Sequence, residues 1–306
     1  MDIVTFQIDA EQEGSRIDSF LAGELDSLSR SYIQKILKNG GVTVNEKAAK
    51  ANYKICDGDL IRLEIPEEQE PDIKPENIPL EVLYEDEDVL VVNKPKDMVV
   101  HPAAGHYEHT LVNAIMYHCA GNLSGINGVL RPGIVHRIDK DTTGALVICK
   151  NDKAHQCLAE QLAVHSITRK YRAIVQGYFS EDSFTIEGDI GRHPTDRKKM
   201  AIVTKNGKPA VTHVKVLERL RGFSYVECQL ETGRTHQIRV HLSSKGHPLL
   251  GDTVYGPAKP AVAGLTGQTL HAMVLGFQHP STGEYIECTA PLPEYFEKLL
   301  RKLRVN

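Results

Sequence analysis

The chain has 306 residues, of which 41% are hydrophobic and 25% charged, and its formal net charge is −4. This balance is typical of a soluble globular protein with room for two domains, and it excludes a disordered chain. No apolar run approaches the roughly 20 residues of a membrane span, and no secretory signal pattern is present, so we expect a cytoplasmic protein without membrane contact.

Residues 1–66 predict a small α/β module. Apolar residues at helical spacing indicate a helix over 16–22, and Ser29 is a candidate N-cap for a second helix. Strands are expected over 42–45 and 60–65, each next to a glycine-containing turn.

Positive charge is concentrated in this module, because residues 30–54 carry six basic side chains and one acidic one. Such a cluster is typical of an RNA-binding surface; the alternative is a solvated basic helix in an unrelated small fold. The segments Ser29-Arg30-Ser31, Gly40-Gly41-Val42-Thr43-Val44-Asn45 and Asp57-Gly58-Asp59 resemble the αL RNA-binding motif shared by a small-subunit ribosomal protein and some tRNA synthetases. The resemblance implies RNA contacts from Arg30, Lys35, Lys38, Lys47 and Lys50, with Lys54 in the same cluster.

An acidic stretch separates this module from the rest of the chain. Residues 67–80 contain three prolines and no hydrophobic period, and proline lacks the amide donor that helices and sheets need. The net charge is −3 over 1–66, −9 over 67–88 and +8 over 89–306. We therefore expect a linker over 67–80 and a larger, basic domain over 81–306.

The larger domain has more predicted strands than helices, and the two do not alternate strictly. This order predicts an α+β fold with a mainly antiparallel mixed sheet and flanking helices, not a doubly wound sheet. The predicted strands are 82–84, 89–95, 134–138, 145–150, 169–177, 200–204, 210–219, 223–231, 270–278 and 284–289, and the predicted helices are 108–119, 152–164, 235–244 and 293–303.

Motifs for metals and nucleotide cofactors are missing from the sequence. The six cysteines form no C-x-x-C pair, and the histidines lack the four-residue spacing that places two ligands on one helix face. Neither a Gly-x-Gly-x-x-Gly motif nor a P-loop is present. We expect reduced cysteines, no metal and no nucleotide cofactor.

One carboxylate, Asp139, lies between the cations Arg137 and Lys140, with apolar residues on both sides of the segment. Nearby positive charge favours the ionised form of a carboxylate, and an oriented carboxylate can act as a nucleophile, a base or a metal ligand. The alternative is a structural salt bridge at a strand end. Asp141 competes for the chemical role, because residues i and i+2 share one face of a strand.

Two further segments combine polar groups in patterns that suit a nucleic acid. Tyr171 lies among the three cations of residues 169–172, which suits stacking on a base with phosphates nearby. A tyrosine packed on a sheet beside solvated cations is the alternative. Arg234 stands at a predicted strand-to-helix corner, where Thr235 is a candidate cap and the helix N-terminus favours anions.

The string His136-Arg137-Ile138-Asp139-Lys140-Asp141-Thr142-Thr143-Gly144-Ala145 resembles the catalytic signature of the pseudouridine synthases of the RluA type. Ile138, Thr143 and Ala145 replace the Leu, Ser and Leu usual in that family. Further family elements match in order at Lys170-Tyr171, at Gly233-Arg234-Thr235-His236-Gln237-Ile238-Arg239-Val240-His241 and at residues 246–256. The resemblance therefore spans essentially the whole chain.

This resemblance implies an isomerase that converts specific uridines of large-subunit (23S) ribosomal RNA to pseudouridine after the target base flips out. It implies that Asp139 is the nucleophile or the group that assists glycosidic cleavage, that Arg234 pairs with Asp139, and that Tyr171 stacks on the uracil or moves a proton. Substrate contacts are expected from Arg137, His136, Thr143 and Gln237. The reaction needs no metal or cofactor, the partner is ribosomal RNA or its assembly intermediate, and a monomer is expected.

Two other functional classes stay open at this stage. A ribosome-assembly RNA binder with a degenerate catalytic fold would be expected to have lost Asp139, Tyr171 or Arg234, and all three are present. A glycoside-type hydrolase needs two carboxylates about 5–10 Å apart, whereas only Asp139 lies in a matching motif. The sequence does not identify the target uridine.

Overall fold

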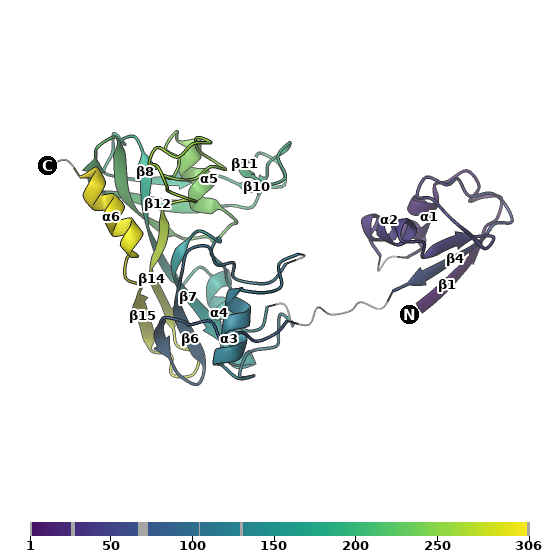
Figure 1. Cartoon of the computed structure of the whole chain (residues 1–306), viewed down its shortest axis with the longest axis horizontal. Coiled ribbons are helices and arrows are strands. Elements are labelled where there is room, and N and C mark those ends of the chain that lie inside the picture. Colours follow the sequence, from purple (N-terminus) through teal and green to yellow (C-terminus); the bar gives the residue numbers. More distant parts are fainter. Residues whose placement is uncertain (1, 26–27, 67–72, 104, 129–130, 305–306) are drawn as a thin grey trace. The chain divides into compact units, whose positions relative to one another are not determined.

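The computed structural model describes residues 2–25, 28–66, 73–103, 105–128 and 131–304 (Figure 1). The chain divides into two compact units, Met1–Glu70 and Pro71–Asn306. Within the described ranges, no helix is long and apolar enough to cross a lipid bilayer.

The first unit contains the predicted small α/β module, with a four-stranded antiparallel sheet in the order β1-β4-β2-β3. The Ser29 hydroxyl caps the second helix by accepting from the amide of Tyr32, as predicted. The first strand and the short third strand had no predicted counterpart. The elements are β1 (Asp2–Gln7), α1 (Ile17–Glu24), α2 (Arg30–Lys38), β2 (Val42–Val44), β3 (Lys47–Ala48) and β4 (Leu60–Ile65).

The predicted linker over 67–80 is only partly described, because residues 67–72 lie outside the described residues. Residues 73–80 pack on the second unit instead of forming a free connector. Ile73 is buried in its core, and Asn113 donates from Nδ2 to the carbonyl of Lys74. Proline excluded regular structure here, but it did not prevent this extended segment from burying an apolar side chain.

The second unit is built on a nine-stranded mixed sheet in the order β5-β6-β7-β14-β8-β13-β12-β9, with β15 paired to β14. Neighbouring strands are antiparallel except for β7 and β14, which are parallel. The predicted α+β class and mainly antiparallel sheet are confirmed. The strands are β5 (Val82–Glu85), β6 (Val89–Lys94), β7 (Thr143–Cys149), β8 (Thr168–Gln176), β9 (Ser183–Glu187), β12 (Val211–Leu220), β13 (Phe223–Leu230), β14 (Leu270–Gln278) and β15 (Tyr285–Thr289).

Four helices flank this sheet: α3 (Leu111–His118), α4 (Asp152–Ala163), α5 (Gln237–Ser244) and α6 (Glu294–Leu303). Alternate residues of β6 enter different clusters, since Leu90 packs with α3 whereas Val89 packs with α4. Every residue of β7 is buried, which explains its almost unbroken apolar sequence. A separate two-stranded arm consists of β10 (Ile190–Arg192) and β11 (Met200–Ile202).

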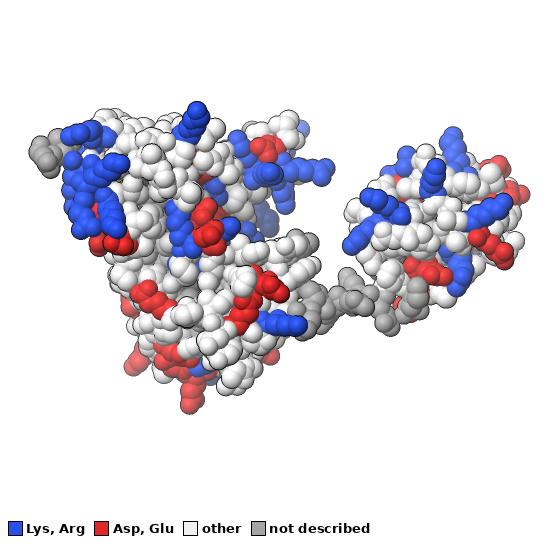
Figure 2. All heavy atoms as spheres, in the orientation of Figure 1, with Lys and Arg blue, Asp and Glu red and all other residues white. Residues whose placement is uncertain are grey.

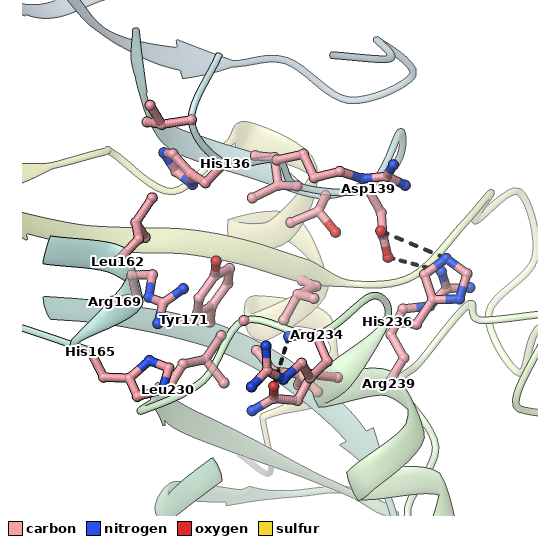
Figure 3. Close-up of a pocket in the computed structure, with 18 of the residues that line it drawn as sticks. His136, Asp139, Leu162, His165, Arg169, Tyr171, Leu230, Arg234, His236 and Arg239 are labelled. Carbon is pink, nitrogen blue, oxygen red and sulfur yellow. Dashed lines mark hydrogen bonds and ion pairs between the residues drawn. The ribbon is translucent and has the colours of Figure 1, made fainter. Parts of the chain in front are cut away.

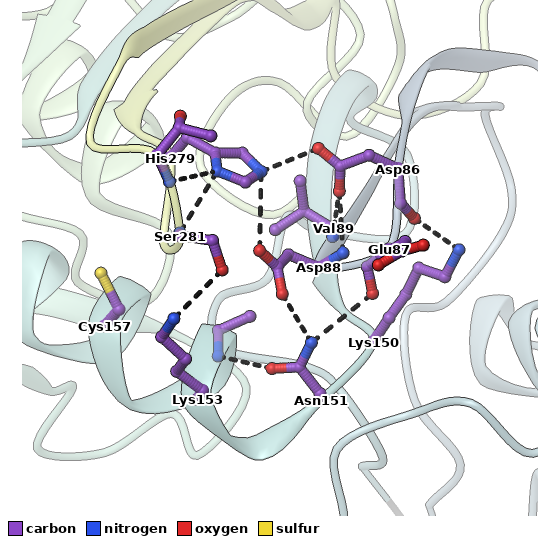
Figure 4. Close-up of polar contacts among 12 residues, drawn as sticks. Asp86, Glu87, Asp88, Val89, Lys150, Asn151, Lys153, Cys157, His279 and Ser281 are labelled. Carbon is purple, nitrogen blue, oxygen red and sulfur yellow. Dashed lines mark hydrogen bonds and ion pairs between the residues drawn. The ribbon is translucent and has the colours of Figure 1, made fainter.

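A polar network ties the turn between β5 and β6 to the turn between β14 and β15 (Figure 4). The Nε2 atom of His279 lies 2.7 Å from Asp86 Oδ2, while its Nδ1 atom accepts from the amides of Ser281 and Thr282. Asn151, the N-cap of α4, donates from Nδ2 to Asp88 at 2.7 Å. These contacts fix the end of the sheet that lies beside α4.

The strand predicted over 134–138 is wrong. This segment is an irregular loop that makes one isolated bridge, between Ile134 and Ile148. Gly133 enters it with φ +70°, and a Cβ at that position would lie 2.5 Å from the carbonyl oxygen of Cys149. The left-handed conformation at Gly133 interrupts an extended strand, so the chain continues as an irregular loop. That loop carries Asp139.

Candidate active site

A cavity of about 440 Å³ opens over β8 (Figure 3). This volume is within the range of small-molecule sites. Its walls come from the loop before β7, the end of α4, the start of β8 and the junction of β13 with α5. The polar residues that line it are His136, Arg137, Asp139, Thr142, His165, Arg169, Tyr171, Arg234, His236, Gln237 and Arg239.

Asp139 is held by Arg239 of α5. The Nη1 atom of Arg239 donates to Asp139 Oδ2 at 2.9 Å, while Nε and Nη2 grip both oxygens of Asp252 at 2.7 and 3.0 Å. Burial by itself lowers the pKa of Arg239, but the two carboxylates outweigh it and raise the pKa. The cation is therefore permanent, and its planar fork aims the Asp139 carboxylate.

The predicted pairing of Arg234 with Asp139 is wrong. Arg234 lies on the opposite wall of the cavity (Figure 3) and donates from Nε to the carbonyl of Pro209 at 2.9 Å. The predicted cap at Thr235 is also wrong, because α5 begins only at Gln237 after His236 turns with φ +57°. This delayed start aims Arg239, rather than Arg234, at Asp139.

Tyr171 lies on β8, on the wall across from Asp139, with its hydroxyl directed into the cavity (Figure 3). The residue is only 8% exposed. Burial raises the pKa of Tyr171; Arg169 acts in the opposite sense, and Asp139 adds to the rise. The phenol is therefore neutral near pH 7, and it is placed to offer both an aromatic face and a hydroxyl.

His236 is a site residue that the sequence reasoning missed. Its Nδ1 atom lies 2.7 Å from the Tyr255 hydroxyl, and its Nε2 atom lies 3.7 Å from Asp139 Oδ1. The amide of Met200 already donates to the same hydroxyl at 2.8 Å. A proton on Nε2 suits this arrangement best, because a lone pair on Nε2 would face the Asp139 carboxylate, whereas Nδ1 can accept from the Tyr255 hydroxyl.

Burial lowers the pKa of His236, although the charge of Asp139 opposes the shift. The neutral ring is thus the form present near pH 7. Its Nε2–H group is a second donor directed at the carboxylate, beside the charged donor of Arg239. His236 lies in the segment 233–241 that resembles the family, but its hydrogen-bond partner Tyr255 is 19 residues away in sequence. The sequence pattern therefore did not reveal the orientation of the ring.

Two of the predicted substrate contacts, Thr143 and Gln237, have side chains that are hydrogen bonded within the protein. The Thr143 hydroxyl lies 2.8 Å from His271 Nδ1 in a buried pair and does not line the cavity. Gln237 reaches the wall, but its Oε1 accepts from Thr232 and from the amide of Arg234, and its Nε2 donates to Val211 and Thr212. Gln237 thus stabilises the junction between β13 and α5 that carries Arg234.

Two other predicted substrate contacts line the cavity. Arg137 is exposed at the edge of the cavity, where a ligand can reach it. His136 accepts from the amide of Val147 at 3.1 Å, and burial lowers its pKa to about 3. A neutral imidazole that accepts a backbone proton holds the loop in place and is not suited to exchanging protons with a ligand.

The loop is also held from behind by a buried lysine. Lys94 is 1% exposed and donates from Nζ to the carbonyls of Lys140, Pro95 and Met98. Burial lowers its pKa to about 7. Asp141, the predicted competitor of Asp139, does not line the cavity; it packs against Gly267, where a Cβ would lie 2.3 Å from its Oδ2.

Comparison with known proteins decides the family. Residues 88–244 match the model for RNA pseudouridylate synthase, and residues 15–61 match the S4 domain. An "Uncharacterized RNA pseudouridine synthase YlyB" of Bacillus subtilis is 54% identical over 306 residues and covers 100% of both chains. The chain belongs to the RNA pseudouridylate synthase family. The predicted family and enzyme class are confirmed.

Other relatives agree with this membership of the pseudouridylate synthases. "Ribosomal large subunit pseudouridine synthase D" of Zymomonas mobilis is 48% identical over 305 residues, covering 97% of this chain and 96% of the relative. The solved structure of human RNA Pseudouridylate Synthase Domain Containing 1 is 28% identical, has a TM-score of 0.56, and matches 78% of this chain and 98% of its own.

The S4 domain of this synthase carries the predicted RNA-binding cluster. Lys35, Lys38, Lys47 and Lys50 are exposed and form no ion pair with any described residue. Figure 2 shows Lys and Arg side chains over the visible face of this unit. Arg30 differs, because it pairs with the buried Asp18 at 3.1 Å and thereby joins α2 to α1.

Asp18 explains why Arg30 is engaged. Burial by itself raises the pKa of Asp18, but hydrogen bonds from Arg16, Gln34 and Arg30 outweigh it and lower the pKa to about 2. The ionised carboxylate needs these partners, so Arg30 is part of the fold as much as of the basic surface.

Proposed function

We propose that this protein converts specific uridines of large-subunit ribosomal RNA to pseudouridine, with Asp139 as the nucleophile. The observation that carries the proposal is the placement of Asp139. It is the one carboxylate among the described lining residues, it is gripped by Arg239, and it faces Tyr171 across the cavity. The large-subunit target rests on relatives named ribosomal large subunit pseudouridine synthase D.

The reaction isomerises the nucleoside without adding or removing atoms. The Asp139 carboxylate attacks C1′ of the ribose, and the N1–C1′ bond breaks with its electron pair leaving on the uracil. The freed uracil turns, C5 bonds to C1′, and the carboxylate leaves. The proton on C5 is then lost, and N1 gains one, so the product has the composition of the substrate.

The residues around Asp139 have separate roles in this scheme. Arg239 keeps the attacking oxygen charged and aimed, and the Nε2–H group of His236 restricts the other oxygen. Tyr171 stacks on the uracil, and its hydroxyl moves a proton. Arg137, exposed at the edge of the cavity, contacts the RNA that the flipped nucleotide leaves behind.

The base must leave its stack before it enters this cavity, which costs a few kcal/mol. Phosphate contacts supply the affinity that offsets this cost. The exposed lysines of the S4 domain are placed to make such contacts on structured RNA. An RNA target of this kind implies that the protein acts in the cytoplasm, and the scheme calls for no metal or cofactor.

The alternatives make different products. A glycoside-type hydrolase would need a second carboxylate about 5–10 Å from the first, and Asp141 packs away from the cavity. Hydrolysis would release free uracil, and an RNA binder without catalysis would leave uridine unchanged.

The test incubates the full chain with unmodified ribosomal RNA and measures pseudouridine and free uracil. We expect pseudouridine from wild type and none from Asp139→Asn, whose amide is nearly isosteric but not anionic. Asp141→Asn is the matched control, since it removes the same charge from the same loop outside the cavity. Pseudouridine formation by Asp139→Asn within tenfold of wild type would contradict the role of Asp139.

A further inference from the structure

Two arginines on the wall opposite Asp139 have no carboxylate partner among the described residues. Arg169 of β8 donates from Nη2 to the carbonyl of Glu231 at 2.8 Å, and Arg234 donates from Nε to the carbonyl of Pro209 at 2.9 Å. Both line the cavity. Neutral carbonyls orient these guanidinium groups but leave both charges uncompensated.

Arg169 is the more unusual of the two, because it is only 6% exposed. Its Nε atom is buried without a hydrogen-bond partner among the described residues. Burial lowers the pKa of Arg169; Tyr171 opposes this shift, and the charge of Arg234 adds to it. A buried cation beside a second cation is unfavourable unless something in the functional state neutralises it.

The backbone leaves room for this cation. Gly233 lies beside Arg169, and a Cβ at Gly233 would lie 2.5 Å from Arg169 Nη1. A side chain at position 233 would require this guanidinium to shift. The arrangement is thus built from the chain itself: a glycine that admits one arginine, followed directly by the other.

The charges that line the cavity are unbalanced on the side of Arg169 and Arg234. Its described lining contains four arginines and one carboxylate. Arg239 already has two carboxylate partners, Asp139 and Asp252, and Arg137 is exposed to solvent. Arg169 and Arg234 therefore need an anion from the ligand.

We infer that Arg169 and Arg234 form a phosphate subsite that binds a backbone phosphate next to the target nucleoside. This inference rests on the proposed function. Phosphate is the anion that RNA supplies, and its oxygens match the planar N–H groups of guanidinium. A uracil carbonyl would be a weaker partner, because it is neutral and cannot offset two like charges. The subsite lies across the cavity from Asp139, so it holds the nucleotide while C1′ meets the carboxylate.

The first test compares the binding of uridine, uridine 5′-monophosphate and uridine 3′-monophosphate to the full chain by NMR titration. We expect at least one of the two nucleotides to bind ten times more tightly than uridine, or more. Arg234→Gln should reduce that preference to less than threefold. Arg221→Gln, which removes an exposed charge from the turn between β12 and β13, is the matched control and should keep it. Equal affinities for uridine and both nucleotides would overturn the inference.

Arg234 is the better position for the variant, because it is half-buried and hydrogen bonded through one nitrogen, whereas replacement of Arg169 risks the fold. Arg234→Lys should restore part of the nucleotide preference, since it keeps the charge but loses the fork. A full loss of preference in Arg234→Gln with an unchanged melting temperature separates a binding role from a structural one.

The second test replaces the phosphates on either side of the target uridine, one at a time, with neutral methylphosphonates in a short RNA substrate. One replacement should slow single turnover at least tenfold in wild type and less than threefold in Arg234→Gln. Equal slowing in both proteins would overturn the subsite while leaving the isomerase function intact. If the protein prefers nucleotides to uridine but forms no pseudouridine, the phosphate subsite stands and the proposed function is overturned.

Discussion

Arg239 and Asp139 meet on one wall of the cavity, with Nη1 of the arginine 2.9 Å from Oδ2 of the aspartate. The arginine comes from α5, whereas the aspartate comes from an irregular loop 100 residues earlier. Asp252 holds the other edge of the same guanidinium and is itself fixed by the amides of Val254 and Tyr255. A loop without regular structure thus receives a rigid position from a helix.

Arg239→Lys should lower the single-turnover rate by about 10²-fold, the order of one lost preorganised donor. Lysine keeps the charge but cannot serve Asp139 and Asp252 together, because an ammonium group has no planar fork. Arg234→Lys is the matched comparison, since it makes the same exchange on the opposite wall. Rates measured with saturating RNA should fall more for Arg239→Lys; a larger fall for Arg234→Lys would return the supporting role to Arg234.

Tyr171→Phe separates the two roles of the tyrosine, because it keeps the aromatic face and removes the hydroxyl. If the hydroxyl moves a proton, single turnover should fall by about 10²–10⁴-fold, while RNA affinity stays near that of wild type. We expect this fall. The measurement is a single-turnover time course with a binding isotherm for the same RNA, and an unchanged rate would leave stacking as the only role of Tyr171.

The structure shows why some of the site could be read from the sequence and some could not. Asp139 and Tyr171 were singled out by local patterns of charge together with the resemblance to a known family, and both line the cavity. Strand β4 has its predicted bounds. The partner of Asp139 was misassigned because it depends on where α5 begins. That start is set by the positive φ of His236, which propensity does not predict.

Long-range contacts fix hydrogen-bond partners that the sequence does not reveal. Thr143 belongs to the family-like string, but its hydroxyl is used by His271, 128 residues away. Arg169 lies in a run of cations around Tyr171 that the sequence left open between phosphate contact and a solvated surface, and the structure buries its side chain in the cavity wall beside Gly233. Charge and spacing locate a site, whereas its hydrogen-bond partners are fixed by the way the sheet brings distant segments together.

His136 should make the protein less stable as the pH falls below 6.5. Its pKa is about 3 in the folded protein and 6.5 when unperturbed, so in this range the unfolded state binds the additional proton. The free energy of unfolding then decreases by about 1.4 kcal/mol per pH unit, or about 2 kcal/mol between pH 6.5 and pH 5. Glutamine can still accept from the amide of Val147, so His136→Gln should lose less stability over this interval. Urea denaturation at the two pH values measures the difference, and equal losses in both proteins would contradict it.

The last prediction concerns the S4 domain, where Lys35 and Lys38 lie on the exposed side of α2. Replacing both with glutamine should weaken binding to structured ribosomal RNA without slowing single turnover at saturating RNA, because Asp139, Tyr171 and Arg239 belong to the other unit. Each lost phosphate contact should make the slope of log affinity against log salt shallower by about 0.7–0.9. Lys298→Gln with Lys302→Gln, on the exposed side of α6, is the matched control, since it removes the same charge from a helix of the catalytic unit. Affinities measured at several salt concentrations distinguish an RNA-binding surface from a solvated basic face. Identical slopes for wild type and the α2 variant would mean that this basic cluster is a solvated face that does not contact the RNA.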